Sequence, residues 1–258
     1  MALGWKSAFA IAFGLTVAAG VLAAAQDPRP QRRERPPEKI DEQPKVVTPG
    51  AMPGQPPSDA IVLFDGKSVA DWVYKDGRPA QWPVADGVLM CKSGTGNIYT
   101  KQRFGSAQIH VEFATPSMPN ARGQARANSG VYLQGRYEIQ ILDSFNNPTY
   151  SNGSNASLYG QYAPLVNVSR PPQEWQSYDI VFHAPKCGPD SQIVTPGTVT
   201  VLNNGVLVQD HVTIRGRTTS SDDTDPCQDG PLMLQDHFHP DVKETFMKFR
   251  NIWIRPLS

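Results

Sequence analysis

The chain contains a pair of strand-like runs, Gly130–Gln134 and Tyr137–Leu142, separated by a Gly-Arg dipeptide, and this pair strongly limits the possible folds. In the second run apolar and polar residues alternate, so the apolar side chains share one face while Glu138 and Gln140 share the other. This pattern is typical of a strand with one packed face and one polar face. It predicts a sheet whose second face is lined with polar groups.

Asp143 lies five residues after Glu138, so a regular strand would turn its side chain to the opposite face. One extra residue, a bulge near Ile141-Leu142, would return Asp143 to the Glu138 face. Two carboxyl groups on one face are what glycosidic-bond chemistry commonly uses. The alternative is a half-exposed strand with a solvated polar face.

The rest of the chain from Ser58 onward reads as strand, turn and strand, without a helical period. About ten short strands predict an all-β sandwich or jelly roll that forms a single domain over residues 58–258. The predicted strands are Ala60–Phe64, Gly87–Met90, Ala107–Ala114, Gly130–Gln134, Tyr137–Leu142, Ser177–His183, Gly197–Leu202, Val206–Val212, Pro231–Gln235 and Phe246–Arg255.

The charge balance limits the classes of partner that the protein is expected to bind. The chain has 24 Lys and Arg against 24 Asp and Glu, so it lacks the basic excess of a nucleic-acid-binding protein. Small molecules or neutral polymers are the expected partners, and no nucleic acid is expected.

The first 57 residues predict export. Lys6 precedes an apolar run over residues 8–25 that ends in three alanines, which is typical of a secretory signal peptide over residues 1–25. The alternative is a retained membrane anchor. Residues 26–57 hold nine prolines and few apolar residues, which predicts a disordered linker. We expect a secreted or periplasmic protein without stable membrane insertion after signal cleavage.

The three cysteines fit this compartment. Cys187 and Cys227 lie in loop-like sequence beside Gly or Pro, whereas Cys91 lies in a strand-like run. We therefore expect a Cys187–Cys227 disulfide and a free Cys91.

A second polar cluster precedes the last predicted strand. On an extended segment Gln235, His237 and His239 share one face, where two imidazoles would bind a metal or carry a proton. Two histidines at this spacing also occur in ordinary loops.

Three further groups have structural as well as functional interpretations. The acidic residues 222, 223, 225 and 229 are either a calcium loop or, as their spacing favours, a solvated loop. His110 and Glu112 share the polar face of one strand, as an exposed or groove-facing edge. Trp72, Trp82, Trp175 and Trp253 are expected in the core rather than as sugar platforms.

In their order and spacing, these motifs resemble the 3-keto-disaccharide hydrolase domain family over nearly all of residues 58–258. The resemblance implies a concanavalin A-like jelly roll of two antiparallel sheets. The matching segments are residues 63–68 with Trp72, 82–89, 128–133, 137–143, 158–160, 174–175, 203–205, 230–231, 235–237 and 249–252.

The resemblance implies cleavage of glycosides that carry a ketone at C3, which acidifies the proton on C2 and allows the glycosidic oxygen on C1 to leave. Such a route needs a base, a proton donor and groups that stabilise an enolate. Glu138 or Asp143 is the predicted base, His237 its acid or base partner, and Gln140 and Arg250 the stabilising groups. A divalent ion on the ketone also fits, with these carboxylates or His237 as ligands. The predicted substrate-binding residues are Asn128, Tyr132, Gln140, Tyr159, Gln235 and Arg250.

The sequence departs from the family pattern after His237, where Phe238 replaces the usual Gly and the link to the last strand is longer. This departure leaves the substrate size and the pose of His237 open. Two other functions are compatible with the fold. One is a laminarinase-like retaining glucanase, which Gln140 and the short Asp143 disfavour, and the other is a lectin-like carbohydrate-binding module.

Overall fold

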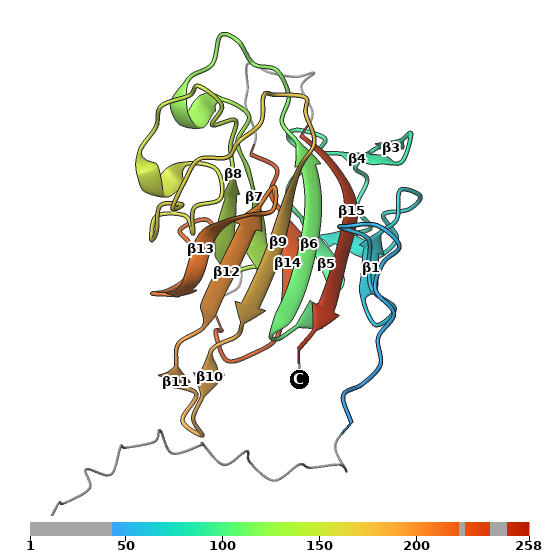
Figure 1. Ribbon diagram of the computed structural model, residues 1–258, viewed down its shortest axis with the longest axis vertical. Coiled ribbons are helices and arrows are strands. Elements are labelled where there is room, and N and C mark those ends of the chain that lie inside the picture. Colours follow the sequence, from blue (N-terminus) through green and yellow to red (C-terminus); the bar gives the residue numbers. More distant parts are fainter. Residues whose placement is uncertain (1–42, 222–224, 238–246, 258) are drawn as a thin grey trace, which may run out of the picture. The chain divides into compact units, whose positions relative to one another are not determined.

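The computed structural model describes residues 43–221, 225–237 and 247–257. Within them the chain is nearly all β, with antiparallel strand pairs in two main sheets (Figure 1). The first has eight strands in the order β13-β12-β9-β6-β15-β4-β3, with β1 also paired to β15. These strands are β1 (Ile61–Phe64), β3 (Val84–Ala85), β4 (Val88–Met90), β6 (Ala107–Ala114), β9 (Gln176–His183), β12 (Thr198–Asn203), β13 (Val206–Thr213) and β15 (Lys248–Pro256).

The second sheet has five strands in the order β2-β5-β14-β7-β8. They are β2 (Trp72–Tyr74), β5 (Ile98–Phe104), β7 (Ser129–Leu133), β8 (Tyr137–Ile141) and β14 (Gly230–Leu234). A separate hairpin joins β10 (Lys186–Cys187) to β11 (Ile193–Thr195), and two short 3₁₀ turns, η1 (Gly123–Ala125) and η2 (Ser151–Gly153), lie in the loops.

The two sheets pack face to face around an apolar core. Tyr137 of β8 meets Phe182 of β9 with ring centroids 5.9 Å apart. Tyr178 of β9 donates its hydroxyl hydrogen to the Gln140 carbonyl of β8 at 2.6 Å. Both contacts join one sheet to the other, and both fix the position of β8. The predicted sandwich of two antiparallel sheets is confirmed.

All ten predicted strands occur, with ends that differ by at most two residues in the described part of the chain. The prediction missed β5, because the polar run Lys101–Arg103 interrupts its alternation. It also missed β2 and three two- or three-residue strands, which are too short to show a period.

The end of the predicted linker lies against the eight-stranded sheet. Thr48 and Ser58 close a turn through hydrogen bonds of 3.0 and 2.9 Å. At its tip the Gly54 carbonyl accepts bonds from the Asn251 amide and the Trp253 indole, each at 2.8 Å. Residues 48–58 are thus anchored to β15.

The predicted disulfide between Cys187 and Cys227 is formed, and Cys91 is free and buried. Of the acidic loop, Asp222 and Asp223 lie outside the described residues, as do the predicted signal peptide and most of the linker. In the part of the chain that the structure describes, we find no helix with the length and apolarity to cross a membrane.

Candidate active site

The polar face of β8 is built by its regular pairing with β7. Tyr132 lies opposite Glu138 and Gly130 opposite Gln140, and the ladder runs from Leu133 to Ser129 without a register shift. Because Val131 and Ile139 belong to the core, these four residues lie on the outer face of the five-stranded sheet. The alternation read from the sequence therefore places Glu138 and Gln140 together.

A glycine makes room for the Glu138 carboxyl group. A Cβ atom on Gly130 would lie 2.5 Å from Glu138 Oε1, closer than real Cβ contacts. Glycine inside a strand signals such a close approach, so this residue was recognisable from the sequence alone. Its lack of a side chain lets Glu138 lie flat along the sheet.

The contacts of Glu138 are neutral hydrogen-bonding groups. The Tyr132 hydroxyl donates to Glu138 Oε2 at 2.8 Å, and the Glu138 backbone N–H donates to Thr218 Oγ1 at 3.0 Å. With its nitrogen toward Glu138, the Gln140 amide donates to Glu138 Oε1 at 3.1 Å and to the Ser129 carbonyl at 2.8 Å. In the reverse orientation the Gln140 side-chain oxygen would face the Glu138 and Ser129 oxygens, which are also hydrogen-bond acceptors.

This environment changes the acidity of Glu138. The side chain is 3% exposed, and among the described residues no Lys, Arg or His pairs with it. Burial raises the pKa of Glu138 from 4.5 to about 7, although the Tyr132 hydrogen bond opposes the change. Burial and the neighbouring Glu138 likewise raise the pKa of Tyr132. Near neutral pH, Glu138 therefore exchanges a proton readily while Tyr132 keeps its own.

The network extends through residues that the sequence did not single out. The Gln124 side chain lies 3.0 Å from the Gln140 amide, and Asn128 Nδ2 donates to the Gln124 backbone carbonyl at 3.0 Å. Gln124 and Thr218 lie in irregular segments, where no periodicity identifies them. Asn128 thus reaches Glu138 through two intervening amides.

Tyr159 and Gln235 also lie at this site. The Tyr159 backbone N–H donates to the Glu138 carbonyl at 3.0 Å, and its hydroxyl lies 2.5 Å from that of Tyr150. Burial is the main cause that raises the pKa of Tyr159. Gln235 Nε2 donates to the Tyr132 hydroxyl at 3.2 Å, while its Oε1 is buried without a hydrogen-bond partner.

Asp143 has a different environment. Strand β8 ends at Ile141, and its pairing with β7 contains no bulge. The bulge that was expected to turn Asp143 to the Glu138 face is therefore absent from this strand pair. Its carboxylate instead pairs with Arg126, with Nε to Oδ2 at 3.0 Å. Burial raises the pKa of Asp143 while Arg126 opposes the change. Asp143 anchors the loop that follows the strand.

His237 follows Gln235 by two residues and is exposed. Between them, Asp236 turns the other way, accepting a bond from the Gly96 N–H at 2.9 Å. His239, its predicted partner in a metal pair, lies outside the described residues. Within the described ranges no three His, Cys, Asp or Glu side chains gather closely enough to hold a metal ion.

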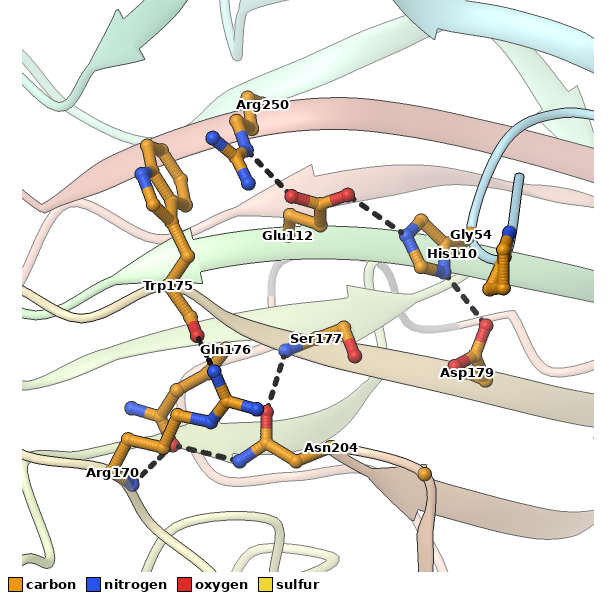
Figure 2. Close-up of a pocket in the computed structure, with 12 residues that line it drawn as sticks. Gly54, His110, Glu112, Arg170, Trp175, Gln176, Ser177, Asp179, Asn204 and Arg250 are labelled. Atoms are coloured by element: carbon orange, nitrogen blue, oxygen red, sulfur yellow. Dashed lines mark hydrogen bonds and ion pairs between the residues drawn. The ribbon is translucent and has the colours of Figure 1, made fainter. Parts of the chain in front are cut away.

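The structure corrects the placement of Arg250. This residue lies on β15 of the eight-stranded sheet, where Nε donates to Glu112 Oε2 at 2.5 Å (Figure 2). Its guanidinium carbon lies 4.1 Å from the centroid of the Trp175 ring. Strands β15 and β8 belong to different sheets, so Arg250 does not join Glu138.

The fold and this polar sheet face define a β-sandwich of the kind found in carbohydrate-active proteins. The model of the 3-keto-alpha-glucoside-1,2-lyase-like domain family matches residues 59–255, and the chain belongs to this family. No curated protein matches the sequence.

Two solved structures from Parabacteroides distasonis ATCC 8503, each provisionally assigned as a glycosyl hydrolase, share the fold. The first is 44% identical, with a TM-score of 0.78 over 86% of this chain and 95% of its own. The second is 20% identical, with a TM-score of 0.57 over 78% and 94% of the two chains, and shows the fold alone. Family and neighbour together support a carbohydrate-active function.

Proposed function

We propose that the protein is an exported enzyme that cleaves glycosides or disaccharides bearing a ketone at C3, with Glu138 as the base. One observation carries this proposal: Glu138 is a buried carboxyl group with neutral partners and a pKa of about 7. A base with such a pKa combines a substantial ionised fraction at neutral pH with a strong tendency to take a proton.

The proposed reaction begins at C2 of the oxidised sugar. Glu138 takes the C2 proton, and the electron pair of the C–H bond forms an enolate with the C3 ketone. That pair then forms the C1–C2 double bond as the C1–O bond breaks. The leaving oxygen keeps the bonding electrons and takes a proton from an acid. Water added across the new double bond would complete a net hydrolysis.

The neighbouring residues have distinct proposed roles. Tyr132 and Gln140 hold the two oxygens of Glu138, so the carboxylate meets C2 in one orientation. Gln235, with its buried unpartnered Oε1, is the proposed contact for a substrate hydroxyl. Exposed His237 is the proposed proton donor to the leaving oxygen. Asn128 and Tyr159 are proposed substrate contacts at the edge of the network.

A retaining glucanase fits this site poorly. Such enzymes place two carboxyl groups about 5 to 5.5 Å apart across the bond that breaks. Here an amide, Gln140, follows Glu138 on the same face, and Asp143 is paired with Arg126. The ketone-assisted route needs one carboxylate base rather than two, which agrees better with the arrangement of Glu138.

The proposal includes export of the protein, and an experiment must decide whether a divalent metal ion takes part in the reaction. The Cys187–Cys227 disulfide supports an oxidising compartment, in agreement with the signal peptide proposed for residues 1–25. The linker proposed from residue 26 would end before the anchored residues 48–58. The groups around Glu138 are a phenol and amides, which are not a typical ligand set for a divalent ion. Activity before and after EDTA treatment tests whether an ion takes part.

The decisive assay offers the purified protein a 3-keto-disaccharide, its unoxidised parent and a β-glucan. Cleavage of the keto-disaccharide alone supports the proposal, and loss of this cleavage in Glu138→Gln supports the assigned base. Cleavage of the glucan would favour the glucanase, whereas binding without turnover would favour the lectin-like module.

A further inference from the structure

A pocket lies on the outer face of the eight-stranded sheet, away from Glu138. Its volume is about 380 Å³, which lies within the usual size of a small-molecule site. Figure 2 shows the side chains that β6, β9 and β15 project into it, with Gly54 of the anchored turn at one end. The pocket is therefore framed by rigid strands rather than by loops alone.

A small residue creates the hollow. Ser177 of β9 lies opposite Glu112 of β6, and two residues further along β9, Asp179 lies opposite His110. Larger side chains stand on either side of Ser177, namely Trp175 and Asp179. The short Ser177 side chain leaves the floor of the pocket open between them.

Most charges in the pocket are paired with one another. His110 Nδ1 lies 2.7 Å from Asp179 Oδ1, and Nε2 lies 3.6 Å from Glu112 Oε1. Glu112 also accepts bonds from Arg250 and Asn251. Although burial opposes the change, the Asp179 and Glu112 carboxylates, which accept from the protonated ring, raise the pKa of His110 to about 9. Two cations and two anions thus balance across the floor near neutral pH.

Arg170 adds a positive charge that the charged groups of the pocket floor do not neutralise. Its NH1 donates to the Trp175 carbonyl at 3.3 Å, and its backbone N–H donates to Gln176 Oε1 at 3.1 Å. Across the described chain no carboxylate pairs with its guanidinium. Figure 2 shows this group between Trp175 and Asn204, facing the hollow. The pocket therefore carries a fixed net charge of about +1.

The remaining groups suit a sugar. Trp175 is partly exposed and is held by the Arg250 guanidinium on one ring face. Aromatic rings of this kind pack against the C–H face of a pyranose, while carboxylates and amides bond its hydroxyls. Glu112, Asp179 and Asn204 supply such polar groups around the hollow.

We propose that this pocket is a non-catalytic binding site for an acidic saccharide. A uronate unit would place its carboxylate on Arg170, since a guanidinium binds a carboxylate through two parallel hydrogen bonds. Its hydroxyls would meet Asp179 and Asn204, and its apolar face Trp175. The site lies on the opposite sheet from Glu138, so it does not depend on the reaction proposed there.

Calorimetric titration of the full chain with disaccharides of galacturonate, glucuronate and mannuronate tests this proposal. We expect at least one to bind with a millimolar or lower Kd, and its methyl ester, which lacks the charge, to bind about tenfold or more weakly. Arg170→Gln should weaken binding of the acid by a similar factor. Arg215→Gln removes an equal charge at Tyr162 and should leave binding unchanged.

Two further measurements make the outcome decisive. Glu138→Gln should bind the acidic disaccharide as tightly as the wild type, which separates this site from the candidate active site. Thermal unfolding shows whether Arg170→Gln keeps its fold. The proposal is overturned if none of the three acids binds at millimolar concentration, if ester and acid bind equally, or if Glu138→Gln loses the binding.

Discussion

Glu138 and Glu112 lie on the outer faces of the two sheets, and their environments differ. Glu138 is nearly inaccessible and contacts a phenol and an amide, so burial raises its pKa to about 7. Glu112 is also partly buried, but hydrogen bonds from His110, Asn251 and Arg250 outweigh burial and lower its pKa to about 2. Each carboxyl group lies on a strand with alternating apolar residues.

The comparison shows that cationic partners, more than burial alone, set the difference in pKa between these two carboxyl groups. Desolvation disfavours the ionised form in both cases, and only Glu112 has the opposite charges that restore it. Glu138, which has neutral partners, is the proposed base, and Glu112, which has cationic partners, helps to fix the floor of the proposed binding pocket.

Replacing Glu138 by Gln should lower the rate of keto-disaccharide cleavage by about 10²- to 10⁴-fold, because a positioned base contributes that much. Steady-state kinetics on the purified variant measures the loss. Glu174→Gln, which changes an exposed glutamate, is the matched control and should keep wild-type rates. Equal losses in both variants would contradict the role of Glu138.

The two glutamates should affect stability in opposite directions as pH changes. The fold raises the pKa of Glu138, so its neutral form stabilises the protein at low pH, and this stability is lost as pH rises from 4.5 to 7. Over this interval the ionisation of Glu138 should lower the free energy of unfolding of the wild type by about 3 kcal/mol. Glu138→Gln should not show this decrease, which urea unfolding of both proteins across the interval measures.

For Glu112 the sign is reversed. Its lowered pKa gives stability that is present above pH 4.5 and lost as pH falls toward 2. Glu112→Gln should therefore flatten the acid side of the stability curve. The contrast fails if both variants change the same side.

Gly130→Ala should displace the Glu138 carboxylate while leaving the glutamate itself in place. The new methyl group would lie 2.5 Å from Glu138 Oε1 and push the carboxylate from its place, which should lower kcat/KM by about ten- to a hundredfold. Gly216→Ala is the control, since a Cβ atom there meets no atom within 4 Å. Unchanged activity in Gly130→Ala would show that the reaction does not need this position of Glu138.

Tyr132→Phe should have the smallest effect and the most specific one. The Tyr132 hydrogen bond lowers the pKa of Glu138, so its removal should raise that pKa further. The acidic limb of the pH profile of kcat/KM, where the base becomes ionised, should move to higher pH by a few tenths to about one pH unit. A shift to lower pH would mean that the limb reports a different group.

The sequence predicted those features that depend on local order along the chain. The ten strands, the outward direction of Glu138 and Gln140, and the Cys187–Cys227 disulfide all follow from patterns within one segment or from residue type. Strand β5 was missed because its exposed polar run hides the period. Gln124 and Thr218 were missed because irregular loops carry no period at all.

Local sequence is enough to give the sheet-forming pattern and the face to which each strand residue turns, because side chains alternate along a strand whatever its neighbours are. Which strands share a sheet depends instead on contacts between distant parts of the folded chain. The sheet arrangement separates Arg250 from Glu138, lets Arg250 pair with Glu112 and leaves Glu138 with neutral partners. Since a pKa depends on charges a few ångströms away in space, residues distant in the sequence set the chemistry of both carboxyl groups.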